Sequence, residues 1–310
     1  MDARVLQVAF AKGVGDVALK KYLHYIHDHC VEQESYLSDE VFRCIGFSVD
    51  MLNSIKNTEE RAKSVFEKLC LKDVEIITET SNDYPQYLKR MLQNKCPPLL
   101  FARGNKRLLS ELSVGFCGSR KVSDKGMAIA TNCTKQLVEK NVTIISGYAA
   151  GTDLTVHKAA LENEGSTIFV LSEGILQARI KKQIAPLLND KNHLFISQFL
   201  PELTWNAGNA MKRNSTIIGL SRAMILVESR LEGGTFAAGE EALRVNCPLF
   251  VIDFSKPDTT AEANPYFISK GGIPIRGKNG IPNMKKVFSS ITSEQRLNDN
   301  ASMEQLQIDM

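Results

Sequence analysis

The sequence predicts an α/β fold, an extended Rossmann-like parallel sheet that follows a small helical N-terminal domain. From Ser113 onward, short apolar runs alternate regularly with helical spans, which is the pattern of a parallel sheet covered by helices. Two of these apolar runs end in small residues that open a helix. Before residue 72, apolar residues recur at near-helical spacing, among them Val17, Leu19, Leu23 and Ile26.

Each element of the sheet follows from its own apolar run. Strands are expected at 113–118, 142–146, 166–171, 193–198, 223–228 and 248–253. Helices are expected between them, at 123–140, 152–164, 178–189, 209–220 and 235–246. The expected domains are a helical domain at 1–72, of SAM-like or helix-hairpin-helix-like type, a Rossmann-like domain at 73–288 and a flexible tail at 289–310.

Bulk properties narrow the possible functions. The 310 residues suffice for one large or two modest domains, and a net charge of +3 means that a local patch must hold any anionic partner. Seven cysteines without a Cys-x-x-Cys pair suggest reduced thiols and a cytoplasmic protein. Residues 1–10 do not resemble a signal peptide and no apolar run is long enough to span a bilayer, so no membrane partner is expected.

The turn in the helical region contains the pattern Gly13-Val14-Gly15. A Gly-x-Gly between helices fits a helix-hairpin-helix, whose backbone N–H groups meet a phosphate, and it equally fits the plain turn of a small bundle. Close to it lie four residues of metal-binding type, but only some share a helix face and no second ligand pair follows: His24, His27, His29 and Cys30. No metal and no cofactor are expected.

Two turns at neighbouring strand ends carry the main functional signal. The first is Gly118-Ser119-Arg120 and the second runs from Ser146-Gly147 to Gly151. Their small residues allow a close backbone approach, and the N–H groups of the helices that follow favour anions. Because parallel strands end at the same edge of a sheet, the two turns are expected to form one phosphate-binding crevice, with Arg120 as a fixed cation.

Further phosphate-binding candidates follow in the chain. Lys212-Arg213-Asn214 opens an apolar helix, where cations and an amide suit a phosphate, although a solvated helix start has the same composition. Gly233-Gly234 forms another glycine turn before a helix. Lys181 and Lys182 are expected on a helix rim near the same strand ends, and a lysine pair is also common on plain surface. Tyr148, in the second turn, could stack on a base or pack on its neighbours.

Several motifs stand in a fixed order between residues 84 and 277. They are Tyr84-Pro85, Leu100-Phe101-x-x-Gly104, Gly118-Ser119-Arg120, Ser146-Gly147-x-Ala149-x-Gly151-x-Asp153, His157-x-Ala159-Ala160-Leu161, Arg213-Asn214, Gly219-Leu220-Ser221 and Glu228. In this order they resemble the DprA/Smf family of DNA-processing proteins. The segment from Asn264 to Gly272 is similar to the family's closing segment.

The resemblance implies a Rossmann-like domain that binds single-stranded DNA and often follows a small helical domain. It also implies a homodimer that loads a RecA-type recombinase onto incoming strands during natural transformation and has no catalytic activity. By position, Arg120 would bind a DNA phosphate, and Arg213 and Asn214 would match the family's Arg-Asn pair. Ser146, Gly147 and Gly151 would shape the pocket wall, and Lys181 or Lys182 would match a DNA-contacting lysine.

The chain departs from the family pattern at several points. Met211-Lys212 stand where the family has Phe-Pro, and Ser215 stands where it has Arg, so that Lys212 would replace a missing charge. Gly233-Gly234 replace a Ser-Gly pair and Ser197-Gln198 replace a Ser-Glu pair. Ile175-Leu176 stand near the place of a Tyr-Pro pair. These departures predict a diverged pocket.

A second function from another class therefore stays open. The chain could be a nucleotide-binding sensor or a phosphoribohydrolase of the related lysine-decarboxylase-like fold. That group carries a Gly-Gly-x-Gly-Thr-x-x-Glu turn, whereas Gly233-Gly234-Thr235 lacks the second glycine and the glutamate spacing. Basic residues at the crevice favour DNA, whereas an acidic pair facing a ribose would favour the enzyme.

Overall fold

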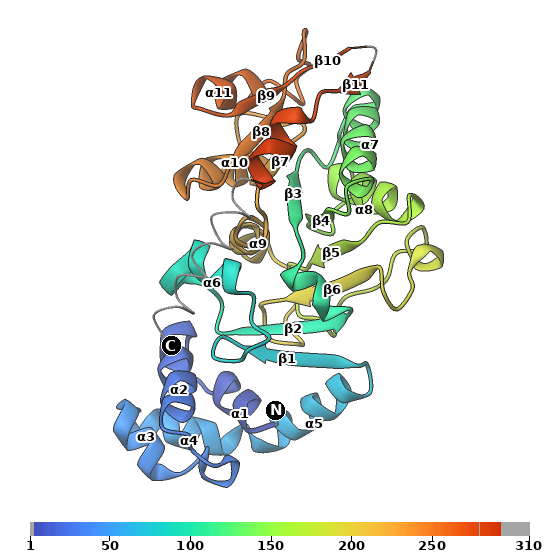
Figure 1. The fold of residues 1–310 in the computed structure, drawn as a ribbon. Helices are drawn as coiled ribbons and strands as arrows, with labels where there is room; N and C mark the ends of the chain where they lie inside the picture. Colours follow the sequence, from blue (N-terminus) through green and yellow to red (C-terminus); the bar gives the residue numbers. More distant parts are fainter. Residues whose placement is uncertain (1–2, 279, 293–310) are drawn as a thin grey trace, which may run out of the picture. The chain divides into compact units, whose positions relative to one another are not determined.

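The computed structural model describes residues 3–278 and 280–292 (Figure 1). The described chain forms two compact units. The first contains the described residues up to Lys106, together with Leu171–Arg179 and Leu194–Asn209. The second contains Arg107–Val170, Ile180–His193 and the described residues from Ala210 onward. The α/β class predicted from the sequence is confirmed.

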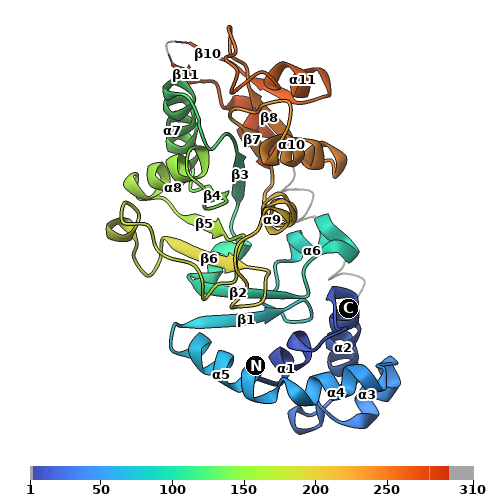
Figure 2. The same ribbon diagram turned by 180° about the vertical axis from the view of Figure 1, so that it is seen from behind.

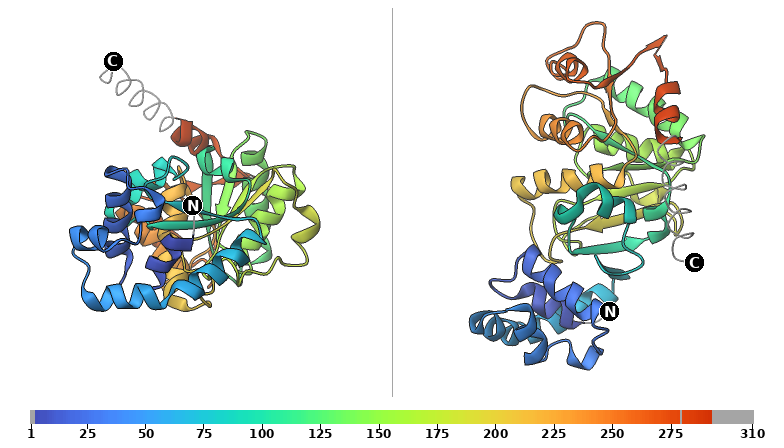
Figure 3. Two further views of the ribbon diagram at one scale, coloured as in Figure 1. Left: turned by 90° about the horizontal axis from the view of Figure 1, so that it is seen from below. Right: turned by 60° about the vertical axis from the view of Figure 1, so that its left-hand side comes forward.

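The N-terminal part of the first unit is helical, as its apolar spacing predicts. Its helices are α1 (Ala3–Phe10), α2 (Asp16–Asp28), α3 (Asp39–Ile45), α4 (Val49–Asn57) and α5 (Glu59–Cys70), which Figure 3 shows lying together. Ser38 and Ser48 cap α3 and α4 by accepting backbone N–H bonds. Gly13 takes a φ of +89° in the turn before α2, a backbone conformation that favours glycine. The extent of a separate domain at 1–72 stays a prediction.

The sheet of the first unit is antiparallel. β1 (Val74–Thr78) pairs with β2 (Leu99–Gly104), and β2 pairs antiparallel with the Leu194–Ser197 part of β6 (His193–Ser197). The helix α6 (Gln86–Leu92) lies between β1 and β2 in the chain. The strand expected at 193–198 therefore exists, but it does not run parallel to β2. Apolar runs give the positions of strands, whereas strand direction depends on partners that are remote in the sequence.

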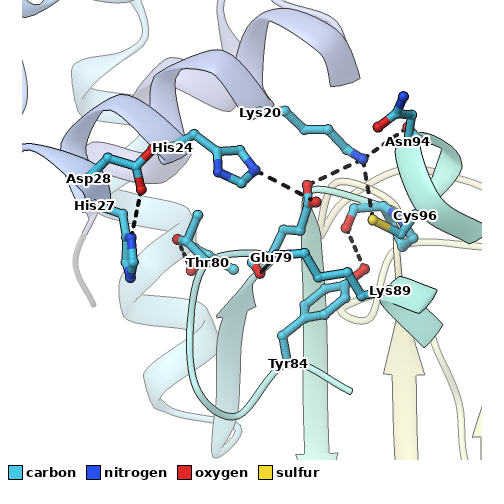
Figure 4. Close-up of polar contacts among 12 residues, drawn as sticks. Lys20, His24, His27, Asp28, Glu79, Thr80, Tyr84, Lys89, Asn94 and Cys96 are labelled. Carbon is cyan, nitrogen blue, oxygen red and sulfur yellow. Dashed lines mark hydrogen bonds and ion pairs between the residues drawn. The ribbon is translucent and has the colours of Figure 1, made fainter. Parts of the chain in front are cut away.

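A buried ion pair connects the helices of this unit to its sheet (Figure 4). Lys20 Nζ, on α2, lies 3.2 Å from Glu79 Oε2, directly after β1, and the two side chains are 15% and 6% exposed. The same ammonium donates to the Asn94 carbonyl at 3.0 Å and to Cys96 Sγ at 3.3 Å. His24 Nε2 lies 3.7 Å from the other oxygen of Glu79. Lys20 thus holds α2 against the segments on either side of α6.

Parallel strands form the centre of the second unit. Their order is β5-β4-β3-β7-β8-β9, and all five pairings between neighbours in this order are parallel. The strands are β3 (Ser113–Cys117), β4 (Thr143–Ser146), β5 (Thr167–Val170), β7 (Met224–Leu226), β8 (Leu249–Ile252) and β9 (Ile273–Ile275). This confirms a Rossmann-like parallel arrangement.

Helices cover both faces of these strands. α7 (Asp124–Val138) and α8 (Thr152–Glu162) lie on one face, and α9 (Ala207–Leu220), α10 (Gly234–Arg244) and α11 (Asn264–Ser269) lie on the other (Figures 1 and 2). Side chains of β3, β4, β7 and β8 meet α7 in a core that contains Phe116, Ile144, Ile225, Phe250, Cys133 and Leu137. The short hairpin β10 (Gly277–Lys278) and β11 (Ile281–Pro282) follows β9.

Two expectations about secondary structure are wrong. The segment 178–189 is not a helix: it contains turns and one short 3₁₀ turn, Ala185–Leu187. Pro186 has no N–H for an α-helical bond, so the apolar residues around it cannot continue a helix. Residues 289–292, expected in the tail, are helical, and Ile291 is buried in the core of the second unit. The rest of the expected tail, 293–310, lies outside the described residues.

The ion pair between α2 and the segment after β1 can be tested by mutation. Lys20→Met is expected to lower the free energy of unfolding by about 3 kcal/mol, because it leaves the buried carboxylate of Glu79 without its partner. Urea unfolding at neutral pH measures this loss. The exposed neighbour gives the matched control, and Lys21→Met is expected to stay within about 0.5 kcal/mol of the wild type.

The double variant Lys20→Met/Glu79→Leu separates the pair from its surroundings. It removes both charges, so it should recover most of the stability lost in the single variant. A single variant as stable as the wild type would show that the ion pair does not hold α2 in place.

Candidate nucleic-acid interface

Three turns lie at the carboxyl ends of adjacent strands in the second unit. The register of the parallel pairs aligns Cys117 at the end of β3 with Leu226 at the end of β7, and Gly115 with Ile145 of β4. The first turn follows β3, the second follows β4, and the third lies between β7 and α10. The expected turns are therefore brought to one edge of the sheet, where ligands of such folds bind.

The first and second turns are in direct contact. Thr152, the first residue of α8, donates through its backbone N–H and its hydroxyl to the Ser119 carbonyl, each at 3.2 Å. A Cβ on Gly151 would lie 2.4 Å from that carbonyl oxygen, and Gly151 has a φ of +76°. A Cβ on Gly118 would lie 2.3 Å from Thr152 Oγ1. Both glycines are therefore required for the approach of one turn to the other.

The third turn is bonded to the first turn and to α9. Thr235 Oγ1, in α10, donates to the Gly118 carbonyl at 3.0 Å. Asn214 Nδ2, in α9, donates to the Gly234 carbonyl at 3.1 Å. Gly233 has a φ of +95°, and no heavy atom lies within 4 Å of a Cβ built on either Gly233 or Gly234. This turn is thus fixed at its back and open at its front.

A carboxylate already occupies the second turn. Asp153, in the first turn of α8, accepts the Ala149 N–H at 3.1 Å and lies 2.8 Å from the Ser146 hydroxyl. Ser146 is buried and its hydroxyl also lies 2.9 Å from the Phe116 carbonyl. The negative charge at the N-terminus of α8 is therefore supplied by the protein itself. Ser146 can shape the wall of the site, but its side chain points into the fold.

His157 fixes the backbone of the second turn from behind. Its Nε2 lies 2.6 Å from the Gly147 carbonyl and its Nδ1 lies 2.6 Å from Thr167 Oγ1, on β5. Complete burial lowers the pKa of His157 to about 4, so the ring is neutral near pH 7. In that state Nε2–H donates to the Gly147 carbonyl, while the Thr167 hydroxyl lies between Nδ1 and the Ile144 carbonyl, to which it donates at 2.9 Å. In the sequence, His157 stands out only as part of a motif, and that motif indicates no such role.

Arg213 packs directly against the second turn. Its side chain is buried, with 7% of its surface exposed, and a Cβ on Gly147 would lie 1.8 Å from its Nη1 atom. Only a glycine at position 147 leaves space for the guanidinium. Arg120 and Lys212, by contrast, are both exposed. The second turn thus has a buried cation, Arg213, packed against it, and the first turn carries an exposed cation, Arg120.

Lys181 and Tyr148 form a further part of the second turn. Lys181 Nζ donates to the Tyr148 carbonyl at 2.7 Å and lies 4.4 Å from the centre of its ring. The backbone N–H of Lys181 donates to the Tyr148 hydroxyl at 2.8 Å. The ring meets Phe169 edge-on at 5.1 Å, so Tyr148 packs on its neighbours. Lys182 is exposed on the irregular segment that follows Lys181.

Two polar residues hold the strand ends around the site. The buried Glu228 accepts the Ser123 N–H at 3.0 Å and also bonds the Ser123 hydroxyl at the start of α7. Asn264 donates to the Val227 carbonyl at 2.8 Å and the Ile252 carbonyl at 2.9 Å, joining the ends of β7 and β8. Glu228 therefore caps a helix and does not face the turns.

The described part of the chain contains neither a metal-binding cluster nor a helix that could span a membrane. Within residues 3–278 and 280–292, no group of His, Cys, Asp and Glu side chains is arranged to hold a metal ion. None of the helices in the same residues is long and apolar enough to cross a bilayer. His24 and His27 contact separate carboxylates, Glu79 and Asp28 respectively.

Protonation of His157 should weaken the fold in mildly acidic solution. Its folded-state pKa of about 4 lies below the ordinary value of 6.5, so its contribution is fully present above pH 6.5 and is lost as the pH falls towards 4. The loss is expected to be about 3 kcal/mol. Urea unfolding between pH 7 and pH 4 should show a steeper fall for the wild type than for His157→Gln. The exposed His29 gives the control, because His29→Gln should keep the wild-type slope.

The contact between position 147 and Arg213 predicts a sharp difference between two glycine substitutions. Gly147→Ala should lower the free energy of unfolding by about 1–3 kcal/mol, because the buried guanidinium cannot move into open space. Gly234→Ala, where a Cβ meets nothing within 4 Å, should change it by less than about 0.5 kcal/mol. Equal melting temperatures for the two variants would contradict the packing of Arg213 on Gly147.

The chain is similar in sequence to known DNA-processing proteins. The chain is 29% identical over 205 residues to the DNA processing protein DprA of Bacillus subtilis, a match that covers 65% of this chain and 68% of that protein. The chain spans from 62% to 68% of the length of three curated DprA and Smf relatives that it matches.

Two solved structures have a similar fold. DprA of Streptococcus pneumoniae superimposes with a TM-score of 0.73 at 24% identity, over 91% of this chain and 97% of that one. DprA of Helicobacter pylori, in a structure that describes its single-stranded DNA binding mode, gives a TM-score of 0.57 at 20% identity, over 72% of this chain and 96% of that one. The family model described as DNA recombination-mediator protein A matches residues 75–283, more than half of the chain. The chain therefore belongs to the DprA/Smf family of DNA recombination-mediator proteins.

Proposed function

We propose that this protein binds single-stranded DNA through its phosphates at the three turns that follow β3, β4 and β7. The observation that carries the proposal is that the Arg213 guanidinium packs on the second turn and Arg120 belongs to the first, in turns that are bonded to one another. Lys212 precedes Arg213 on α9 and is included in the proposal as a third cation. Cations and backbone N–H groups are the usual partners of phosphate oxygens. The DNA-binding mode described for the Helicobacter pylori relative supports the same ligand.

The distribution of charge favours a phosphate backbone over a single small anion. Asp153 satisfies the N–H of Ala149, so the second turn alone is a poor site for an isolated phosphate. The surface cations Arg120 and Lys212 come from the first turn and from α9. Charges from separate elements suit an extended chain of phosphates, because each cation can meet a different one.

We further propose that the protein forms a homodimer and helps to load a RecA-type recombinase onto the bound strand. Membership of a family of DNA recombination mediators supports this role, and natural transformation is the process in which it would act. The proposed activity is binding and assembly, without a catalysed reaction.

The nucleotide-binding alternative has weaker support from the site. Hydrolysis of a nucleotide would need an acidic pair that faces the ligand. The buried Glu228 instead caps α7, and Asp153 bonds Ser146 and Ala149. Binding assays with free nucleotides and with single-stranded DNA under the same conditions distinguish the two functions.

Affinity for single-stranded DNA should fall steeply as salt rises. If the three cations each neutralise a phosphate, the log–log slope should be roughly −2, at about −0.7 for each contact. Fluorescence anisotropy with a labelled oligonucleotide between 50 and 300 mM salt, which is about the range where such effects are large, measures the slope. Affinity that does not change with salt, or tighter binding of a duplex, would overturn the proposal.

Substitution of the exposed arginine tests the site directly. Arg120→Ala should weaken single-strand binding by about ten- to hundredfold, equivalent to about 1.5–3 kcal/mol, through loss of one charge-assisted contact. Arg120→Lys should fall between, because it keeps the charge but loses the planar fork. Lys140→Ala removes an exposed charge before β4, at the opposite strand end, and should bind as the wild type does. Melting temperatures should be the same for all three, and normal binding by Arg120→Ala would exclude Arg120 from the site.

A further inference from the structure

The second unit also contains a pocket, which lies outside the three turns. Its volume is about 340 Å³, within the range of roughly 300–1,000 Å³ that small-molecule sites occupy. Asp253 and Phe254 line it directly after β8, and Arg276 lines it directly after β9. The first turns of α7 add Lys125 and Ile129. The pocket is therefore built from strand ends and the start of a helix, as ligand sites of parallel sheets are.

The pocket lies along the same edge of the sheet as the phosphate-binding turns. The register aligns Cys117 of β3 with Leu226 of β7, Leu226 with Val251 of β8, and Ile252 with Ile275 of β9. At about 4.8 Å between strands, β8 lies roughly 10 Å from β3. A strand with a rise of about 3.4 Å per nucleotide would cover that distance with about three nucleotides. One strand could thus reach both places.

The lining combines a flat apolar wall with a small excess of positive charge. Ile252 and Ile275 are buried at its base, and the ring of Phe254 is partly exposed with Lys125 Nζ 5.3 Å from its centre. Arg276 Nε bonds Asp253 Oδ2 at 2.7 Å, and the Arg276 side chain is 76% exposed. The lining carries two cations and one carboxylate, which leaves an excess of one positive charge.

These features fit a nucleotide. A base is flat and can pack against isoleucine side chains and a phenyl ring, as bases do on aromatic residues of single-strand binders. A phosphate suits Lys125 and the outer nitrogens of Arg276. Asp253 can accept a hydrogen bond from a base amino group. A purely apolar ligand would offer no anionic group to Lys125 or to the outer nitrogens of Arg276.

We propose that this pocket binds one nucleotide, with its base on the wall of Ile129, Ile252 and Phe254 and its phosphate at Lys125 and Arg276. If this nucleotide belongs to the DNA strand that the three turns hold, the proposal rests on the proposed function. A free nucleotide presents the same chemistry, so the test has one arm for each source.

The first arm measures how affinity depends on strand length. Wild-type affinity should rise with oligonucleotide length until both places are filled and then level off. Arg276→Ala and Phe254→Ala should each lower the affinity for long strands about tenfold. In both variants the affinity should stop rising at a shorter oligonucleotide length, and its final value should equal the wild-type affinity for short strands. Lys140→Ala serves as the charge control, and melting temperatures check the fold, with Arg276→Ala as the safer variant because its side chain is exposed.

The second arm titrates dGMP, dAMP and dTMP by calorimetry. Binding by the wild type that Arg276→Ala and Phe254→Ala both weaken, with the DNA length dependence unchanged, would assign the pocket to a free nucleotide and support the proposal. Unchanged length dependence together with no variant-sensitive nucleotide binding would overturn it. Binding of short strands does not depend on this pocket. Normal short-strand binding by Arg120→Ala would therefore show that the proposed function fails, independently of the result for the pocket.

Discussion

The site depends on a buried guanidinium that packs on a glycine backbone. Arg213 lies so close to Gly147 that no side chain fits at that position, and His157 Nε2 lies 2.6 Å from the carbonyl oxygen of the same glycine. The turn is therefore held both by packing and by a hydrogen bond. Burial of a cation costs desolvation energy, and buried charges are therefore found mainly where they have a structural or functional role. Here the positive charge lies beside the turn after β4, where an anionic ligand would benefit from it.

The three turns support one another through bonds between the chain segments that carry them. Thr152 connects the second turn to the first, Thr235 connects the third to the first, and Asn214 connects α9 to the third. Each of these bonds ends on a backbone carbonyl. Residues that appear in the sequence as separate glycine motifs therefore form one pre-organised surface. Pre-organisation of this kind would lower the ordering cost of the proposed binding of a flexible strand.

The sequence predicts the positions of the strands and the location of the three turns at one edge of the sheet, because both follow from apolar runs and the small residues that end them. It does not predict that Gly118 and Gly151 allow the first and second turns to contact each other. A glycine indicates that another group approaches the backbone closely, but the sequence does not show which group this is. The same limit applies to His157, whose two partners lie in the turn after β4 and on β5. Strand direction in the first unit and the irregular segment around Pro186 depend on remote contacts and on one missing N–H, and neither leaves a periodic pattern.

The buried pair of Lys20 and Glu79 limits how freely the helical region can be exchanged. Glu79 lies after β1, whereas Lys20, the cation that neutralises it, lies on α2. The residue types at these two positions therefore depend on each other. A chain that carried an unrelated set of helices over the same segment would bury this carboxylate without its partner. Exchange of the helical region therefore requires a cation at the place of Lys20 or an uncharged residue at position 79.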